Sequence, residues 1–186
     1  MSELYNQAEQ FVKESFTKKG KTHQIEHFVR TAYWIKQLKP DADEALLISA
    51  IAHDIERAFR QKDVLEKKHS AGFTDKEFLR THEERGAKII GKFLEKQGAK
   101  KELIERVKML VSKHEEGGNE DQDLLKDADS VSFFENNVQL FLRDKVNEVG
   151  KEEVKQKFDW MYNRISSEKA KQIVKAWYEK AIKSLN

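Results

Sequence analysis

The chain has 186 residues, a length that fits one domain able to bury roughly two-thirds of its unfolded surface. Its 35 lysines and arginines against 33 aspartates and glutamates leave a formal net charge of +2, which gives no electrostatic case for nucleic acid or an anionic membrane as partner. The sequence contains no cysteine, which excludes disulfides, thiolate nucleophiles and iron–sulfur clusters and fits a reducing compartment.

Helices are expected from the start of the chain, because only one proline and eight glycines interrupt it. Residues 5–16 space their apolar side chains three or four apart, without the continuous apolar run of a secretory signal. A second helix over 22–38 should halt before Pro40, and Asp41 with Glu44 predicts a capping box that opens a third helix through Ile51. This third helix is apolar nearly all round, so we expect it at the centre of the core.

Charged residues 56–73 predict a surface connection with room for one short helix. Thr74 and Glu77 form a second candidate capping box, for a helix that runs to about residue 97 and stops at Gly98. A helix over about 101–114 should end at the glycines 117–118, and an acidic loop over 117–123 leads into a long helical tail. No segment alternates with period two and none has the ~20 apolar residues of a membrane span. We therefore predict one all-α, cytoplasmic domain over residues 1–186.

Adjacent His53 and Asp54, at the end of the most apolar predicted helix, are the sharpest chemical feature. Charged groups are rarely buried in full unless they are paired or bind a metal. The simpler alternative is that the helix ends there and Asp54 reaches solvent. Asp127 and Asp129 lie in a second apolar stretch. Side chains two residues apart on a helix point in different directions, so at most one of them faces a common site while the other caps or positions it. A helix start capped by either aspartate is the simpler alternative.

His23 and His27 are spaced four apart, so both can project from one face of a helix. A zinc-protease motif needs glutamate directly after the first histidine, where this chain has Gln24, and that class is therefore excluded. One of the two histidines can bind metal while the other contacts substrate or orients a neighbour. His69 lies in a loop-like context and is expected at the surface.

In this order, His27, His53–Asp54 and Asp129 resemble the HD-domain superfamily of metal-dependent phosphohydrolases. The resemblance spans about residues 20–135 and is carried by the segments HQIEHFVRTAYWI, ALLISAIAHDIE and LLKDADSV. It implies an all-α helical bundle of the HD-domain type. Residues 136–186 match no motif of the family, and their helices could cover the core, line the substrate entrance or form a homodimer contact.

Two further segments, THEERGAKIIGKFL and VSKHEEGG, are similar to those of HD enzymes with two metals, including the HD-GYP phosphodiesterases. The chain departs from that subgroup at Lys113 and at Glu56–Arg57, and it lacks the GYP tripeptide, which argues against cyclic dinucleotide hydrolysis. The implied metal ligands are His27, His53, Asp54, His82, His114 and Asp129. Imidazole and carboxylate donors suit one or two ions of Mn²⁺, Fe²⁺, Co²⁺, Ni²⁺ or Zn²⁺, with Mg²⁺ also compatible.

The implied activity is hydrolysis of a phosphate ester in a small molecule such as a nucleotide, by water that a bound metal activates. Asp54, Glu56 and Glu83 are the catalytic candidates, the two glutamates for protonating the leaving group or orienting water. The candidates for binding substrate are His23, Arg30, Arg57, Lys113 and Lys126. The sequence leaves monoester and diester substrates unresolved. The alternative is a non-catalytic metal- or nucleotide-binding signalling module, which the departures at Lys113 and Glu56–Arg57 suggest.

Overall fold

The computed structural model describes residues 2–60 and 75–185, and within these ranges the chain is helical and contains no strand. The predicted all-α fold is thereby confirmed. In chain order the elements are α1 (Glu3–Thr17), the 3₁₀ turn η1 (Thr22–Gln24), α2 (Ile25–Leu38), α3 (Glu44–Ala52), α4 (Glu56–Phe59), α6 (Lys76–Lys96), α7 (Lys101–Val111), α8 (Glu120–Asn136), α9 (Val138–Leu140), the π-helical turn η2 (Phe141–Lys145), α10 (Val146–Val149), α11 (Lys151–Asn163) and α12 (Glu168–Lys183). No helix among the described residues combines the length and the apolarity needed to cross a membrane.

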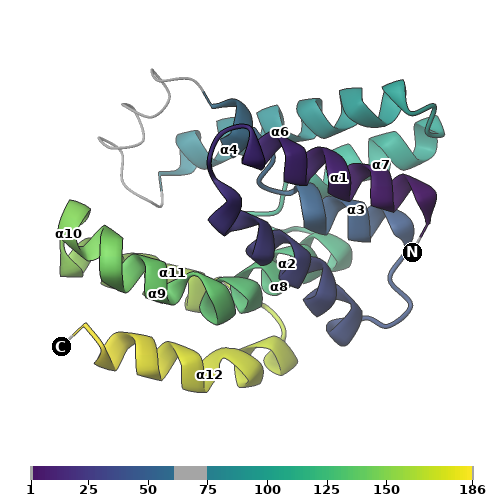
Figure 1. Ribbon diagram of the computed structural model, residues 1–186. Helices are drawn as coiled ribbons and strands as arrows, with labels where there is room; N and C mark the ends of the chain where they lie inside the picture. The colour runs from purple at the N-terminus through teal and green to yellow at the C-terminus, as the bar shows by residue number, and fades with distance from the viewer. Residues whose placement is uncertain (1, 61–74, 186) are drawn as a thin grey trace.

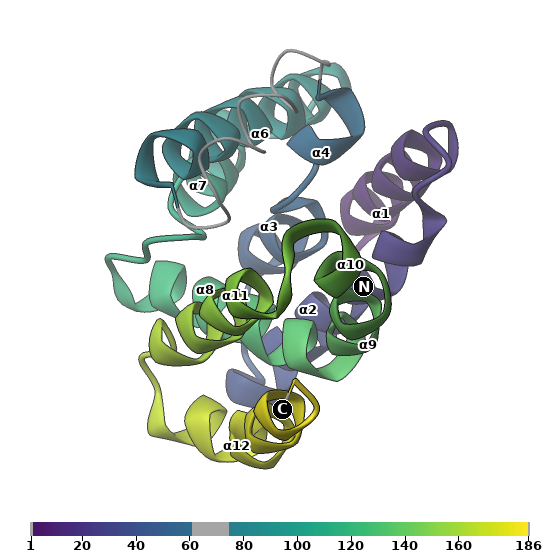
Figure 2. The same cartoon turned by 90° about the vertical axis from the view of Figure 1, so that its left-hand side faces the viewer.

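Helix α3 forms the centre of the bundle, as its all-round apolar sequence predicts. Every residue from Ala45 to Ala52 is buried, and α1, α2, α7 and α8 pack around the helix. In both views α12 lies on the opposite side of the molecule from α6 and α7, with α2, α3 and α8 between them (Figure 1, Figure 2). The end of α3, where His53 follows, is therefore surrounded by other elements.

Two apolar clusters share helix α8. Leu125 and Ala128 belong to the cluster built from α1, α2, α3, α6 and α7, whereas Val131 and the residues after it pack with α11 and α12. Asp129 lies between these two sets of apolar contacts along the helix. The motif-bearing helices and the helices without motifs therefore meet at the position of this carboxylate.

Several predicted helix boundaries are wrong by a few residues. Asp43, not Asp41, caps α3, because its carboxylate accepts a hydrogen bond from the amide of Leu46 at 2.9 Å. The segment 22–38 begins with a 3₁₀ turn, and the α-helix proper starts at Ile25. Thr74 lies outside the described residues, and α6 is capped by Asp75, which accepts from the amide of Phe78 at 2.7 Å. These differences are local, because competing caps lie within two residues of each other.

Two other boundary predictions also need correction. Helix α7 ends at Val111, so His114 lies in the turn that follows and not in the helix. Most of the acidic loop predicted over 117–123 is instead the first turn of α8, capped by Asn119 through a reciprocal capping box with Gln122. Its carboxylates suit this place, because acidic side chains interact favourably with the N-terminal end of a helix dipole.

The connection predicted over 56–73 is only partly described. Its first residues form α4, in which Glu56 and Ala58 are buried, so this part does not lie on the surface as predicted. The remainder, including His69, lies outside the described residues. Gly98 follows α6 with a φ of +72°, a left-handed conformation that favours glycine, and the predicted stop is confirmed.

Candidate metal centre

Side chains from separate segments converge at the end of α3 in two groups that could each hold a metal ion. The first group is His27, His53 and Asp54, and the second is Asp54, His82, His114 and Glu115. Within each group the candidate ligand atoms lie within 4.8 Å of one another, and every member is buried. Asp54 belongs to both groups, so two ions held here would share its carboxylate.

The pair His53–Asp54 reaches the centre because α3 ends at Ala52 and the chain turns into α4. His53 donates from Nδ1 to the carbonyl of Ala50 at 2.8 Å, one of the carbonyls that the end of a helix leaves unpaired. Its Nε2 then lies 3.6 Å from Asp54 Oδ2 and 3.4 Å from Asp129 Oδ1. The most apolar helix therefore delivers an imidazole and a carboxylate directly into the buried centre.

The other three histidines present their Nε2 atoms in the same way. His27 Nδ1 donates to the hydroxyl of Ser132 at 2.9 Å, and that hydroxyl donates to the His27 carbonyl at 2.8 Å. His114 Nδ1 donates to the carbonyl of Val111 at 2.8 Å. His82 Nδ1 lies 2.8 Å from Glu56 Oε2. Metal-binding histidines typically hold their second nitrogen by such a hydrogen bond, which fixes both the tautomer and the ring orientation.

The donor atoms fit a metal ion. The Nε2 atoms of His53 and His114 are buried and have no hydrogen-bond partner among the described residues. A buried polar atom without a partner costs roughly 1–3 kcal/mol, and a bound cation would remove that cost. Imidazoles beside buried carboxylates form a ligand set for a divalent transition metal.

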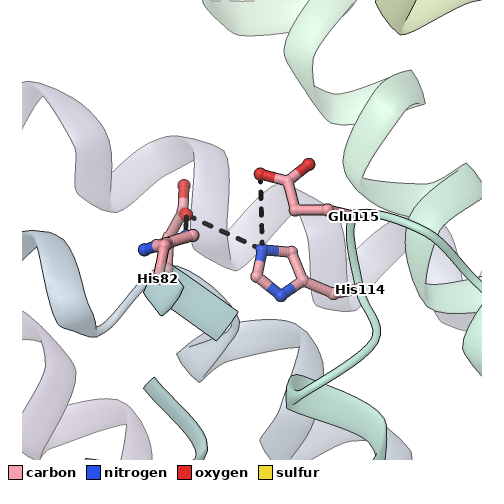
Figure 3. Close-up of side chains that lie close together, drawn as sticks. His82, His114 and Glu115 are labelled. Carbon is pink, nitrogen blue, oxygen red and sulfur yellow. Dashed lines mark hydrogen bonds and ion pairs between the residues drawn. The ribbon is translucent and has the colours of Figure 1, made fainter. Parts of the chain in front are cut away.

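Glu115 is the member of these groups that the sequence did not predict as a ligand. Its Oε1 lies 3.7 Å from His114 Nε2, and the two side chains approach one another beside His82 (Figure 3). The backbone amide of Glu115 donates to Glu83 Oε1 at 2.7 Å, which fixes the turn after α7. Glu116, the next residue, is exposed and pairs with Lys113. In the sequence, only its position directly after His114 could have indicated Glu115 as a ligand, and the adjacent Glu116 is an equally plausible candidate by that criterion.

Two glycines allow the elements around the second group to approach closely. A Cβ on Gly86 in α6 would lie 3.4 Å from the carbonyl oxygen of His53, so α6 can rest against the end of α3 and bring His82 to Asp54. Gly117 has a φ of +79°, and a Cβ there would lie 2.0 Å from Asp123 Oδ1. Glycine at this turn therefore positions the segment that carries His114.

Arg164, from the region without motifs, connects Glu115 of the second group to Asp129, a predicted ligand that lies beside the first group but belongs to neither. Its guanidinium donates to the carboxylates of Glu115 and Asp129 and, through Nε, to the hydroxyl of Ser130 at 2.8 Å. Asp129 Oδ1 in turn lies 3.0 Å from His27 Nε2. One buried arginine therefore fixes the orientation of a carboxylate beside each group. No local motif predicted this role.

The electrostatics of the centre keep its carboxylates ionised. Burial opposes ionisation of Asp54, but Arg57 and His53 hold its pKa well below the usual range. Burial likewise opposes ionisation of Glu115, and Arg164 outweighs it and lowers the pKa to about 2. Burial would lower the pKa of His53, yet Asp129 and Asp54 raise it to about 9, while burial lowers the pKa of His114 to about 4. The carboxylates of the centre therefore stay ionised, the form in which they can bind a metal ion.

Asp127 and Asp129 divide their tasks as the spacing predicted. Asp129 faces the centre, whereas Asp127 accepts hydrogen bonds from the backbone amides of Ser166 and Ser167 at 2.8 and 2.7 Å. Ser167 is the N-cap of α12. Neither aspartate starts a helix, because both lie in the middle of α8. Asp127 instead ties α8 to the turn between α11 and α12.

Glu56 and Glu83, predicted as catalytic, lie beside the ligands and not at the centre of the pocket. Glu56 contacts His82 and forms an ion pair with Arg60, and its pKa is lowered to about 2: burial opposes ionisation, but the hydrogen bonds from His82 and Arg60 prevail. Burial raises the pKa of Glu83 to about 7, and its carboxylate accepts the amide of Glu115. Their geometry favours positioning of ligands over proton transfer to a substrate.

Of the five residues predicted to bind substrate, two line the pocket and three do not. His23 and Arg57 line the pocket described below, and Arg57 Nε lies 2.9 Å from Asp54 Oδ1. Arg30, Lys113 and Lys126 do not line it. Each of these three is engaged elsewhere: Arg30 with Glu135, Lys113 with Glu116, and Lys126 with Asp123 and the hydroxyl of Ser166.

The centre opens into a pocket of about 220 Å³. Four members of the ligand groups line this pocket, together with the neighbouring Asp129: His27, Asp54, His82 and Glu115. The basic side chains in its lining are Lys21, Arg57, Arg60, Lys145 and Lys157, and the apolar ones are Phe78, Leu79, Phe133, Leu140, Phe141 and Met161. Helices without motifs thus supply much of the wall, in agreement with one of the three roles expected for residues 136–186.

Comparison with known proteins places the chain in a family without assigning it an activity. No curated protein and no solved structure matches the sequence significantly. Residues 5–185, nearly the whole chain, match the family DUF4202, which is described as a domain of unknown function. The two ligand groups and the pocket lie within this range. The protein therefore belongs to the DUF4202 family.

Proposed function

We propose that this protein is a metal-dependent phosphohydrolase that acts on a small phosphorylated molecule. One observation carries the proposal: two buried ligand groups share Asp54, and the pocket that opens onto them is lined by basic side chains. Two neighbouring metal ions beside cationic side chains would stabilise displacement at phosphorus, because negative charge develops on the phosphoryl oxygens. The resemblance to HD-domain phosphohydrolases points to the same chemistry and stays a prediction.

The position of each residue in the centre determines which ion it would bind. His27 and His53, with Asp54, would hold one ion, and His82, His114 and Glu115, with the same Asp54, a second. A bound divalent metal lowers the pKa of a coordinated water toward about 7 and polarises a phosphoryl oxygen. Arg57, which lines the pocket beside Asp54, is placed to offset charge on the phosphoryl group.

Pocket size and lining limit the substrate. A volume of about 220 Å³ lies below the roughly 300–1,000 Å³ of pockets that take drug-sized ligands, so the enclosed part of the substrate is small. Phe78 and Phe133 line the same pocket as the basic side chains. A phosphate attached to a compact apolar or aromatic group, such as a nucleoside, fits this combination.

The test is hydrolysis by protein loaded in turn with Mn²⁺, Fe²⁺, Co²⁺, Ni²⁺, Zn²⁺ and Mg²⁺. The substrate panel holds phosphomonoesters, nucleotides and phosphodiesters, and metal per chain is measured by elemental analysis. Asp54→Ala should abolish turnover and reduce bound metal, whereas Asp41→Ala, at an exposed aspartate, should change neither. If no substrate turns over and Asp54→Ala keeps its full metal content, the proposal is wrong.

A second candidate is a binding module that holds metal and nucleotide without turnover. The geometry of Glu56 and Glu83 favours it, because Glu83 does not line the pocket and the carboxylate of Glu56 is engaged by His82 and Arg60. This module would bind nucleotide tightly in the assays above and leave it intact. Turnover that depends on Asp54 would exclude it.

A further inference from the structure

Lys157, on helix α11, is buried in the wall of the pocket, and the sequence did not indicate it as a residue of the site. Its side chain is only 8% exposed and lines the same pocket as Glu115 and Asp129. Phe158 and Met161 anchor this part of α11 in the second apolar cluster. The helix therefore holds an ammonium group against the metal centre, where burial of a charge costs several kcal/mol unless it is compensated.

The other basic side chains of the pocket already have partners. Arg60 pairs with Glu56, Arg57 lies against Asp54, and Lys145 pairs with Glu148. The remaining lysine of the lining, Lys21, donates to the backbone carbonyl of Arg57 at 2.7 Å.

Lys157 differs from all of these. Among the described residues no carboxylate forms an ion pair with it, and its contacts are with aromatic rings. Its Nζ lies 4.2 Å from the ring centre of Trp160 and 5.9 Å from that of Phe133. Such contacts stabilise a cation by about 0.5–2 kcal/mol and hold it in place, but they leave its hydrogen-bond donors unused.

Burial lowers the pKa of Lys157 to about 8, so most molecules still carry the charge at pH 7. The protein therefore keeps a desolvated, positioned cation beside the metal ligands at a cost to its own stability. Residues kept at such a cost are expected where function needs them. An anion that enters the pocket would meet this ammonium without first displacing a carboxylate.

We propose that Lys157 binds the phosphoryl group of the substrate, and that α11 is thus a substrate-binding element. This inference rests on the proposed function for the identity of the anion. The ammonium would donate to a non-bridging phosphoryl oxygen while Asp54 and its neighbouring ligands hold the metal. The specificity of the pocket would then come from the helices that carry no family motif.

The test uses inorganic phosphate and the full-length, metal-loaded protein, and it does not depend on turnover. Lys157→Met removes the charge at similar length. Lys155→Met is the matched control, because Lys155 lies on the same helix, is half-buried at most and pairs with Asp159. Calorimetry measures the phosphate affinity of each variant, and thermal unfolding shows that each is folded. We expect Lys157→Met to weaken phosphate binding roughly 10- to 100-fold, as loss of a hydrogen bond to a charged group predicts, and Lys155→Met to leave it unchanged.

A measurement on the wild type covers the case in which Lys157→Met does not fold. In protein labelled with ¹⁵N at lysine Nζ, phosphate should shift the resonance of Lys157 and not that of Lys155. Equal phosphate affinity in Lys157→Met and wild type, an unshifted Lys157 resonance, or no phosphate binding by the wild type would each overturn the inference. Hydrolysis that survives with an unchanged KM in Lys157→Met would leave the proposed function standing and remove Lys157 from it. Phosphate binding that needs Lys157, without hydrolysis of any substrate, would support the inference and reject the proposed function.

Discussion

Replacing Asp127 by alanine should destabilise the fold and leave the metal centre intact. Asp127 is 1% exposed and accepts two backbone hydrogen bonds, at 2.8 Å from Ser166 and 2.7 Å from Ser167. Two hydrogen bonds to a charged acceptor would contribute about 3–6 kcal/mol in total. Burial raises the pKa of Asp127 against the effect of both amides, and Ser166 is exposed, so desolvation and access of water reduce this sum. We therefore expect a loss of about 2–3 kcal/mol, or a fall in Tm of roughly 4–12 °C for a chain of this size.

Asp129→Ala is the matched comparison, two residues along the same helix. It removes the carboxylate that lies beside the first group, 3.0 Å from His27 Nε2 and 3.4 Å from His53 Nε2, so the affinity of that group for metal should fall. Metal per chain by elemental analysis and Tm by calorimetry, measured on both variants, separate the two effects. A variant Asp127→Ala that loses metal while keeping its Tm would refute the assignment of this carboxylate to the fold.

Four other outcomes follow from the geometry. Glu115→Gln should lower the metal content by up to one ion per chain while Glu116→Gln leaves it unchanged, because only the first glutamate lies in a ligand group; equal metal content in the two variants would exclude Glu115 as a ligand. Glu56→Gln weakens the hydrogen bond at His82 Nδ1, so the metal affinity, measured in competition with a chelator, should fall about 10- to 100-fold. Metal at about 100 times its Kd adds ~2.7 kcal/mol to stability, so EDTA should lower the Tm by roughly 5–10 °C. The pKa of Lys157 is lowered from 10.5 to about 8, so the unfolded chain binds more protons between these values. Urea unfolding should therefore show Lys157→Met more stable than the wild type at pH 7, with the difference shrinking as the pH rises from 8 to 10.5.

The fold could be predicted because its signals are local. Ala45–Ala52 is apolar nearly all round, and only a position in the middle of the bundle buries such a helix. The apolar stretches around His53–Asp54 and Asp129 indicated buried polar groups that must be compensated. The full set of candidate ligands, with His27, His82 and His114, was implied by the resemblance to the HD-domain superfamily. Helix ends were less certain, because Asp41 and Asp43 offer equivalent caps, and the choice depends on backbone angles that neither residue encodes alone.

The sequence by itself determined a helical protein, since periodicity is a property of neighbours along the chain, and its resemblance to a known family implied a set of candidate metal ligands. Only the tertiary structure decided which charged side chains belong to the site. Glu115 and Glu116 are identical in type and adjacent, and Arg164, 49 positions away, engages the first of them. Lys157 is one of 35 basic residues and stands out only because α11 buries it beside the ligands. A charge acquires its role from burial and from the partners that folding brings to it, and neither is written in its local sequence.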